Sequence, residues 1–214
     1  MDKTMTATRT GSTAATLTPQ RDTPDAADLA RLVDQSLAED LGTGDLTAQL
    51  IDATSTCSAR VVVREAAVLC GRAWFDRVYE CLDPQVRVQW QAADGDRMVA
   101  GQLICTVSGS ARSVNSGERT ALNLLQTLSG TATIARRYAD AVATSATVIL
   151  DTRKTLPGLR MAQKYAVRCG GCANHRMGLH DAMLIKENHI AAAGGLRNAV
   201  DRARTANPQA PLEV

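Results

Sequence analysis

The sequence is poor in aromatic residues and has almost no excess of charge. Phe, Trp and Tyr make up 3% of its 214 residues, which is too little for the stacked aromatic platforms that bind single-stranded nucleic acids. Lysine and arginine number 24 against 22 aspartates and glutamates, for a formal net charge of +2. A protein that coats nucleic acid or an anionic membrane carries a large excess of one sign. The composition excludes such a polyelectrolyte and disfavours a nucleic-acid module.

Long apolar segments are also absent. No stretch approaches the roughly 18 consecutive apolar residues of a membrane span, and the N-terminus lacks the apolar core of a secretory signal. The six cysteines are scattered, and a chain of this length does not need disulfide bonds to hold its fold. We therefore expect a cytoplasmic protein whose cysteines are reduced.

What is present is the ordinary balance of a globular protein, with 45% hydrophobic and 21% charged residues. Residues 1–27 depart from it, because they are rich in threonine and alanine and almost free of bulky apolar side chains. Such a segment gains too little from burial to offset the entropy of ordering, so we expect a flexible tail. An organellar transit peptide is the alternative, since two arginines lie among hydroxyl residues, although three aspartates argue against it.

Residues 28–117 combine helical and strand patterns. Leucines and a valine recur at helical spacing over 29–41, and Gly42 supplies the stop. Runs rich in β-branched residues predict strands, and short Asp/Gly clusters between them predict tight turns. We expect an α+β domain with an antiparallel sheet, made of strands 59–69, 86–92 and 103–107 and a second helix at 73–82.

Residues 118–214 show a different pattern. A long helix is expected over 118–143, with Ser116 as its N-cap. Short apolar runs then alternate with helical segments, an order that predicts a parallel sheet or α/β barrel. The expected strands are 148–150, 182–185 and 212–214, and the expected helices are 159–167 and 190–205. The last strand has no covering helix, so we expect a fragment that ends after about three barrel strands.

Two of these strands end in cationic loops. In parallel α/β folds the residues just past the strand ends converge on one face, where the site lies. Residues 151–189 contain seven basic and three acidic residues, whereas the rest of the chain is slightly acidic. Arg153, Lys154 and Lys186 at the strand ends are expected to bind a ligand with several negative charges. The alternative, a solvated helical face, is expected to account for three further cations, Arg160, Lys164 and Arg168.

The segment RCGGCANHRMG, residues 168–178, holds two cysteines and a histidine. Cys169, Cys172 and His175 suggest a zinc or redox site, but a structural zinc site needs a second pair of ligands at matching spacing. The more plausible interpretation is two small buried side chains in a tight turn.

Arg119 is unusual for its expected place in the first turn of a helix. A cation there opposes the helix dipole, so Arg119 should have a partner elsewhere, such as an anionic ligand. A surface arginine is the alternative.

Four blocks of sequence resemble the quinolinate phosphoribosyltransferase family, also called nicotinate-nucleotide pyrophosphorylases (carboxylating). They are AEDLGTGDLTA (38–48), SGERTALNLLQTLSGTAT (116–133), LDTRKTLPGLRMAQKYAVRCGG (150–171) and NHRMGLHDAMLIKENHI (174–190). The similarity extends from about residue 29 to residue 214.

The resemblance implies an α/β fold in which an N-terminal sandwich domain is followed by an open, incomplete α/β barrel. It implies a homodimer with shared active sites, in which one subunit's N-terminal domain closes the barrel mouth of the other. The implied reaction joins quinolinate to phosphoribosyl pyrophosphate and yields nicotinate mononucleotide, CO₂ and pyrophosphate, in the de novo synthesis of NAD. Mg²⁺ is expected on the pyrophosphate, with no ligand assigned in this chain.

The resemblance also implies roles for particular residues. Arg119 would reach the neighbouring subunit's site, and Thr152 would line the pocket. Arg153, His175 and Arg176 would hold the quinolinate carboxylates, and the catalytic Lys154 and Lys186 would lie between quinolinate and the donor.

Two features depart from the family pattern. Cys172 stands where the family usually continues a run of glycines, so its side chain is expected to crowd the turn before His175. The family's acidic residues for ribose and metal lie later, although Glu213 begins the acidic strand. An inactive truncated fragment, a non-catalytic dimerising paralogue and a transferase for a related pyridine carboxylate are therefore alternatives.

Overall fold

Helix α1 (Ala26–Leu41) opens the part of the chain that the computed structural model describes, residues 23–214. The Asp25 side chain accepts a hydrogen bond from the Asp28 amide at 2.8 Å and so caps the first turn. Gly42 follows the last turn with a φ of 51°, a left-handed value that glycine adopts without strain. The predicted helix 29–41 is confirmed. The expected tail lies outside the described residues except for residues 23–27.

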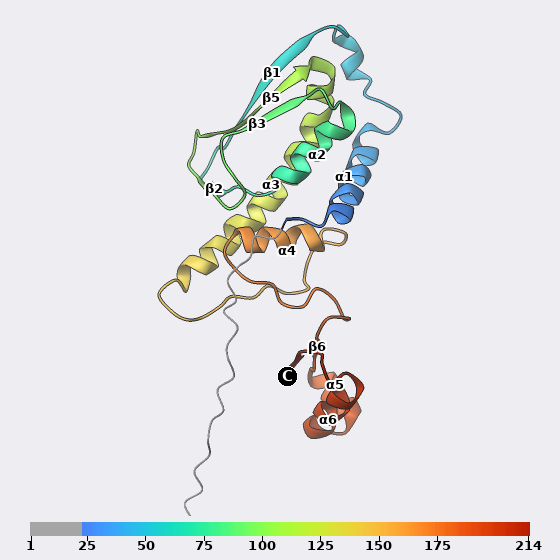
Figure 1. The fold of residues 1–214 in the computed structure, drawn as a ribbon, viewed down its shortest axis with the longest axis vertical. Helices are drawn as coiled ribbons and strands as arrows, with labels where there is room; N and C mark the ends of the chain where they lie inside the picture. Colours follow the sequence, from blue (N-terminus) through green and yellow to red (C-terminus); the bar gives the residue numbers. More distant parts are fainter. Residues whose placement is uncertain (1–22) are drawn as a thin grey trace, which may run out of the picture.

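An antiparallel sheet forms the upper part of the molecule (Figure 1). Its order is β1 (Thr56–Val62), β5 (Leu103–Ser110) and β3 (Arg87–Trp90), with Val107 paired to Ala59 on one side and to Val88 on the other. The predicted antiparallel sheet is confirmed. The single strand expected over 59–69 is wrong, because a bend at Arg64 and Glu65 interrupts it. The chain resumes as β2 (Ala67–Val68), which pairs with β4 (Arg97–Met98).

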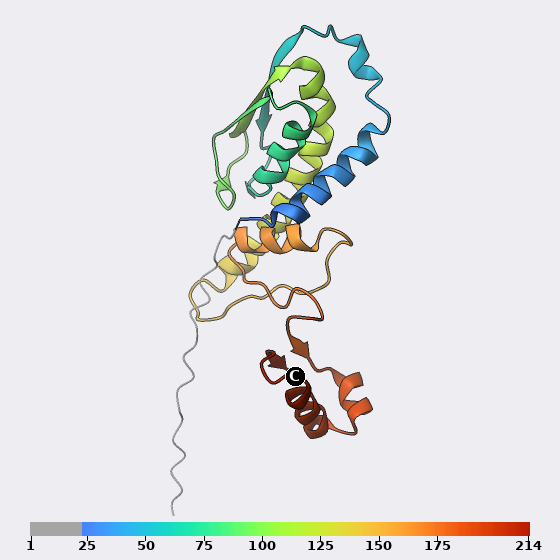
Figure 2. The ribbon, with the colours of Figure 1, turned by 45° about the vertical axis from the view of Figure 1, so that its right-hand side comes forward.

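Helices α2 (Arg72–Leu82) and α3 (Ala111–Ala141) cover one face of this sheet, and α1 lies beside α2 (Figures 1 and 2). They bury a common apolar core with the sheet, whose fully buried side chains include Trp74, Phe75, Val78, Val107 and Leu128.

The long helix begins earlier than expected. It starts at Ala111, so Ser116 lies inside it. The prediction that Ser116 is the N-cap is wrong. Gly117 is also helical, and a Cβ there would lie 2.7 Å from the Tyr79 ring, so only glycine allows this approach. Close packing of α3 on α2 thus explains a glycine that resembles a helix boundary in the sequence. The expected domain boundary at 117/118 falls within α3.

Helix α4 (Arg160–Cys169) crosses the C-terminal half of α3 (Figure 1). The two helices approach closely where α4 ends, since a Cβ on Gly170 would lie 2.4 Å from the Cβ of Ala135. The expected helix 159–167 is confirmed. The expected strand 148–150 is reduced to one parallel bridge between Leu150 and Ala173.

The last part of the chain forms a small unit set apart from the rest in both views (Figures 1 and 2). Strands β6 (Met183–Leu184) and β7 (Leu212–Glu213) pair in parallel, as predicted. The chain between them forms α5 (Glu187–Ala193) and α6 (Leu196–Ala206). The single helix expected over 190–205 is wrong, because Gly194 and Gly195 have φ values of 79° and 128° and break it. The described residues form no closed barrel. None of their helices has both the length and the apolarity to cross a membrane.

Candidate active site

Two loops that lie apart in sequence begin side by side. The Asp151 amide donates to the Ala173 carbonyl at 3.1 Å, and the Ala173 amide donates to the Ile149 carbonyl at 2.9 Å. This short parallel bridge sends residues 151–155 and residues 174–176 out from the same edge. The loop after the expected strand 148–150 thus lies beside a second loop, but that loop follows Ala173. The expected strand 182–185 corresponds to β6, which pairs with β7 instead.

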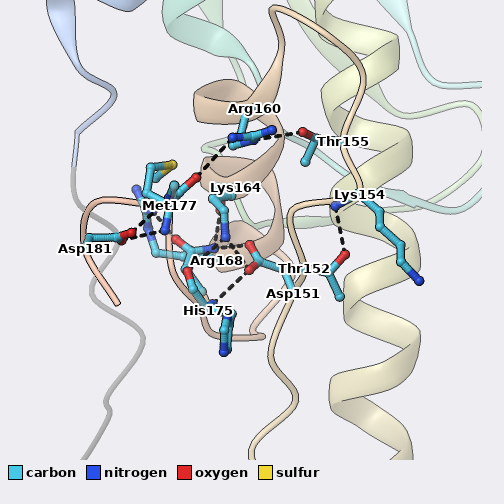
Figure 3. A network of polar contacts seen from close by, with 12 residues as sticks. Asp151, Thr152, Lys154, Thr155, Arg160, Lys164, Arg168, His175, Met177 and Asp181 are labelled. Carbon is cyan, nitrogen blue, oxygen red and sulfur yellow. Dashed lines mark hydrogen bonds and ion pairs between the residues drawn. The ribbon is translucent and has the colours of Figure 1, made fainter. Parts of the chain in front are cut away.

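Beneath these loops lies a buried ion pair (Figure 3). Lys164 Nζ donates to Asp151 Oδ1 at 2.5 Å, and the two side chains are 1% and 9% exposed. The prediction that Lys164 belongs to a solvated face is wrong, because this side of α4 packs inward and the lysine finds a carboxylate there.

The other two helical arginines are not simply solvated either. Arg160 donates from Nε to Thr155 Oγ1 at 3.2 Å and from Nη1 to the Met177 carbonyl at 3.3 Å, so it joins the two loops (Figure 3). Arg168 donates to Asn174 Oδ1 at 2.5 Å. The three cations of α4 hold the loops in place, which corrects the sequence interpretation.

His175 is held at its backbone and at its ring. Its amide donates to Asp151 Oδ1 at 2.8 Å, and its carbonyl accepts from Lys164 Nζ at 2.9 Å. Its ring Nε2 lies 2.5 Å from Glu213 Oε2 on β7. The neighbouring Asn174 donates to Asp151 Oδ2 at 2.7 Å and to the Lys164 carbonyl at 3.0 Å. The sequence analysis did not foresee these partners.

Two arginines lie on the two loops, Arg153 on the first and Arg176 on the second. Arg153 Nε is buried and has no hydrogen-bond partner within residues 23–214, which leaves an unsatisfied cationic donor in the site. Arg176 donates to the Ala182 carbonyl at 3.1 Å. Asp181 accepts from the Met177 and Gly178 amides at 2.6 and 2.9 Å, and these bonds hold the pKa of its carboxyl below the ordinary value. The turn after Arg176 is thereby fixed.

Thr152, Lys154 and Lys186 are more exposed. Thr152 Oγ1 accepts from the Lys154 amide at 3.0 Å, and the Lys154 side chain points away from the buried pair (Figure 3). Lys186 directly precedes α5, and its amide donates to His189 Nδ1 at 3.0 Å. No hydrogen bond among the described residues links the Lys186 side chain to the two loops.

Arg119 lies elsewhere in the chain. It is exposed on α3 and lines a groove of about 940 Å³ between α3 and β1, together with Arg60, Arg64 and Arg137. It is two turns inside the helix, so the argument from a first-turn cation is wrong. The groove contains none of the loop residues, and the structure therefore separates Arg119 from Arg153 within one chain.

Ser116, near Arg119, connects two of the sequence blocks. Its hydroxyl donates to Asp45 Oδ2 at 2.7 Å, while Asp45 Oδ1 accepts from the amides of Thr47 and Ala48 in the short helix η1 (Thr47–Leu50). The Ser116 hydrogen bond, followed by that of the Ala48 amide, lowers the pKa of the Asp45 carboxyl.

None of the six cysteines, all of which lie within residues 23–214, forms a disulfide. Cys169 and Cys172 are both buried near the turn after α4, which agrees with the preferred interpretation. Cys172 Sγ donates to the Ala135 carbonyl at 3.1 Å, so it faces α3 and does not crowd His175. Cys169 instead lies close to Cys70 and Asp94. The atoms of these three residues that could bind a metal ion are all within 4.8 Å of one another. Tyr165 and the amides of residues 71 and 72 already donate to Asp94.

Family models match nearly the whole described chain. The model for the quinolinate phosphoribosyl transferase N-terminal domain covers residues 45–129, and that for the C-terminal domain covers residues 131–214. A solved nicotinate-nucleotide pyrophosphorylase from Francisella tularensis is 44% identical with a TM-score of 0.87, and the match covers 91% of this chain and 70% of that one. The chain belongs to the quinolinate phosphoribosyltransferase family. The resemblance and the fold class inferred from the sequence are confirmed.

Further relatives agree. NadC from Streptococcus pyogenes is 37% identical with a TM-score of 0.86 over 90% of this chain and 70% of its own. Proteins named probable nicotinate-nucleotide pyrophosphorylase (carboxylating) from Synechocystis and Bacillus subtilis are each 43% identical, over 84% and 83% of this chain. The chain spans 61% and 62% of these two curated relatives, about three fifths of their length.

Proposed function

We propose that this quinolinate phosphoribosyltransferase homologue transfers the phosphoribosyl group of phosphoribosyl pyrophosphate to quinolinate and releases CO₂ and pyrophosphate. The product is nicotinate mononucleotide, in the de novo synthesis of NAD. The observation that carries the proposal is the bridge between Leu150 and Ala173, which sends the Arg153 loop and the His175–Arg176 loop out together. Two arginines and a histidine on adjacent loops suit a dicarboxylate.

The residues divide the two substrates between them. Arg153, whose buried Nε lacks a partner among the described residues, holds one quinolinate carboxylate with its planar fork. His175 and Arg176 hold the second carboxylate. The exposed Lys154 and Lys186 give compact positive charges between quinolinate and the donor phosphates, and Thr152 lines the same pocket.

The chemistry needs positioning and charge. The C–O bond to pyrophosphate breaks as the ribosyl carbon becomes oxocarbenium-like, and the pyridine nitrogen supplies the electron pair of the new C–N bond. Lys154 and Lys186 stabilise the leaving pyrophosphate. The nitrogen is then cationic, so the ring accepts the electron pair left when the adjacent carboxylate departs as CO₂, and the ring carbon afterwards takes a proton. No covalent enzyme intermediate is required.

We further propose that Mg²⁺ arrives chelated to the donor pyrophosphate. The carboxylates beside the loops are already engaged, Asp151 by Lys164 and Glu213 by His175. The group of possible ligands found in residues 23–214 contains two thiols, which suit Mg²⁺ poorly. The phosphate oxygens of the substrate are the better ligands.

The separation of Arg119 from the loops supports a homodimer with shared sites. An exposed arginine in a groove lined by Arg60, Arg64 and Arg137 is suited to an anionic substrate held by a second copy. We propose that each N-terminal unit brings Arg119 to its partner's site, and that the enzyme works in the cytoplasm.

A non-catalytic dimerising paralogue is a weaker interpretation. Such a protein has no need to keep Arg153, Lys154 and Lys186 with His175 and Arg176, and the names of the similar proteins all denote enzymes. Nicotinate, a related pyridine carboxylate, has one carboxylate where quinolinate has two, and the assay below includes that comparison.

The test uses quinolinate labelled with ¹⁴C in its 2-carboxylate, incubated with phosphoribosyl pyrophosphate and Mg²⁺. We expect ¹⁴CO₂ and nicotinate mononucleotide in equal amounts, both lost in Lys154→Ala and retained in the surface control Arg97→Ala. Nicotinate in place of quinolinate should yield no nucleotide. Absence of both products with a folded protein would contradict the proposal.

A further inference from the structure

The ion pair between Asp151 and Lys164 is costly for packing alone. Both side chains are almost fully buried, at 9% and 1% exposure, and taking two charges from water costs about as much as or more than their attraction returns. The rest of this side of α4 is apolar, with Ala162, Ala166 and Cys169 buried. An apolar pair would serve the packing equally well, so the charges call for another explanation.

The geometry points to His175. The two members of the pair reach opposite sides of the same residue, since Asp151 Oδ1 accepts from its amide at 2.8 Å and Lys164 Nζ donates to its carbonyl at 2.9 Å (Figure 3). Asp151 also accepts from Asn174 at 2.7 Å through its second oxygen. Charged partners make stronger hydrogen bonds than neutral ones. The backbone of His175 is therefore held at both its amide and its carbonyl, and the side chain of the preceding Asn174 is anchored to the same carboxylate.

The pair is also electrically neutral as a unit. Asp151 alone would place a negative charge directly beneath the loops that are proposed to bind a dicarboxylate, and Lys164 cancels it at 2.5 Å. Asp151 can thus supply two acceptor oxygens to the loop without repelling the substrate.

We propose that Asp151 and Lys164 are positioning residues for dicarboxylate binding. This inference rests on the proposed function and goes beyond it, because neither residue belongs to the set expected to touch quinolinate. They act through His175 and Arg176, by fixing the peptide that sets where those side chains point.

The decisive variant is Asp151→Leu/Lys164→Met, which removes both charges and both bonds to His175 but keeps apolar bulk. Replacing a buried pair in this way is often neutral for stability, but the amide and carbonyl of His175 and the side chain of Asn174 each lose a partner, so a folded protein with a modestly lower melting temperature is expected. The control is Asp140→Leu/Arg97→Met, which replaces an ion pair of 2.6 Å that is 44% and 64% exposed on the surface. Asp151→Asn is the conservative variant, because it keeps an oxygen for the His175 amide.

Two readouts separate positioning from a general structural role. The KM for quinolinate should rise about ten-fold or more in the double variant, with an intermediate rise in Asp151→Asn, while the KM for phosphoribosyl pyrophosphate should stay within about two-fold. Amide hydrogen exchange should accelerate at residues 174–176 and stay unchanged in α2 and β5. The control variant should show neither effect.

The exchange measurement does not depend on the reaction. If the parent lacks transferase activity but exchange still accelerates only at residues 174–176, the proposed function fails while the restraint of the His175 backbone stands. If the double variant is folded and shows parental exchange and parental quinolinate KM, or if both substrates lose affinity equally, the positioning role is wrong.

Discussion

Cys172 belongs to the segment that carries His175 and Arg176, yet its thiol faces the packing against α3. Its sulfur donates to the Ala135 carbonyl at 3.1 Å, and burial raises the pKa of the thiol. The residue therefore contributes to the fold at this point and does not reach the loop surface where a substrate would bind.

Replacing Cys172 by alanine should show whether this residue stabilises the fold or shapes the substrate site. We expect Cys172→Ala to lose about 1 kcal/mol of unfolding free energy, because one hydrogen bond and a small buried volume disappear. Quinolinate affinity should not change. Denaturant unfolding and calorimetry check both, with exposed Cys81→Ala as the matched control. A large loss of quinolinate affinity at unchanged stability would show that Cys172 shapes the site.

At the level of single residues, the sequence suggested roles but did not reveal burial. Arg153 was singled out because it follows an expected strand end, and His175 through its glycine-rich segment and the family resemblance; the roles of both stay predictions. Lys164 was misplaced, because one lysine on a helix is normally solvated and its partner Asp151 lies 13 positions away. The available signal was its register, since Lys164 falls among Ala162, Tyr165 and Ala166 on the apolar side of α4.

At the level of elements, the contact between α3 and α4 fixes the end of α4, from which the chain leads to the loop of residues 174–176. Gly170 ends α4 against α3, and a Cβ there would meet Ala135 Cβ at 2.4 Å and the Ala132 carbonyl at 2.5 Å. Both neighbours belong to a helix and cannot move aside cheaply. The loop of residues 174–176 follows four residues later, so its position depends on this close approach.

We expect Gly170→Ala to push α4 away from α3, cost about 1–3 kcal/mol of stability and weaken quinolinate binding. The matched control is Gly130→Ala in α3, where a Cβ has open space and alanine should stabilise the helix by about 0.5–1 kcal/mol. Thermal melts and calorimetry of both variants provide the test. Equal stability of the two would contradict the packing argument.

Helices and strands with clear periodicity, such as α1, α2 and β3, were predictable from sequence. The start of α3 was not, because Ser116 and Gly117 have the chemistry of a helix boundary. Their actual roles are tertiary: Ser116 donates to Asp45 over 71 positions, and Gly117 lets Tyr79 approach. Contacts of such sequence separation leave no local pattern.

At the level of the whole molecule, two parts of the proposed site lie in different places. Arg119 lines the groove of α3 and β1, whereas Arg153 lies on the loop after Leu150. If the site is shared, the two arginines come from different copies of the chain. The sequence resemblance implied this arrangement, and the separation within one chain supports it.

Mixing inactive variants tests this sharing. Arg119→Ala and Arg153→Ala should each be inactive alone, but in a mixed dimer one site receives both intact arginines. With random exchange of subunits, about a quarter of the parental activity should return. The assay measures nicotinate mononucleotide after co-refolding, with each variant refolded alone as the control. No recovery from demonstrated mixed dimers would show that both arginines serve one chain's own site.

The central claim is that the adjoining loops of residues 151–155 and 174–176 form a dicarboxylate site. Calorimetric titration with quinolinate in the absence of phosphoribosyl pyrophosphate, on the parent and on Arg153→Ala, tests it most directly. We predict saturable binding by the parent that Arg153→Ala loses, while the surface control Arg97→Ala binds normally. Equal binding by the parent and Arg153→Ala, or no binding by a folded parent, would contradict the account.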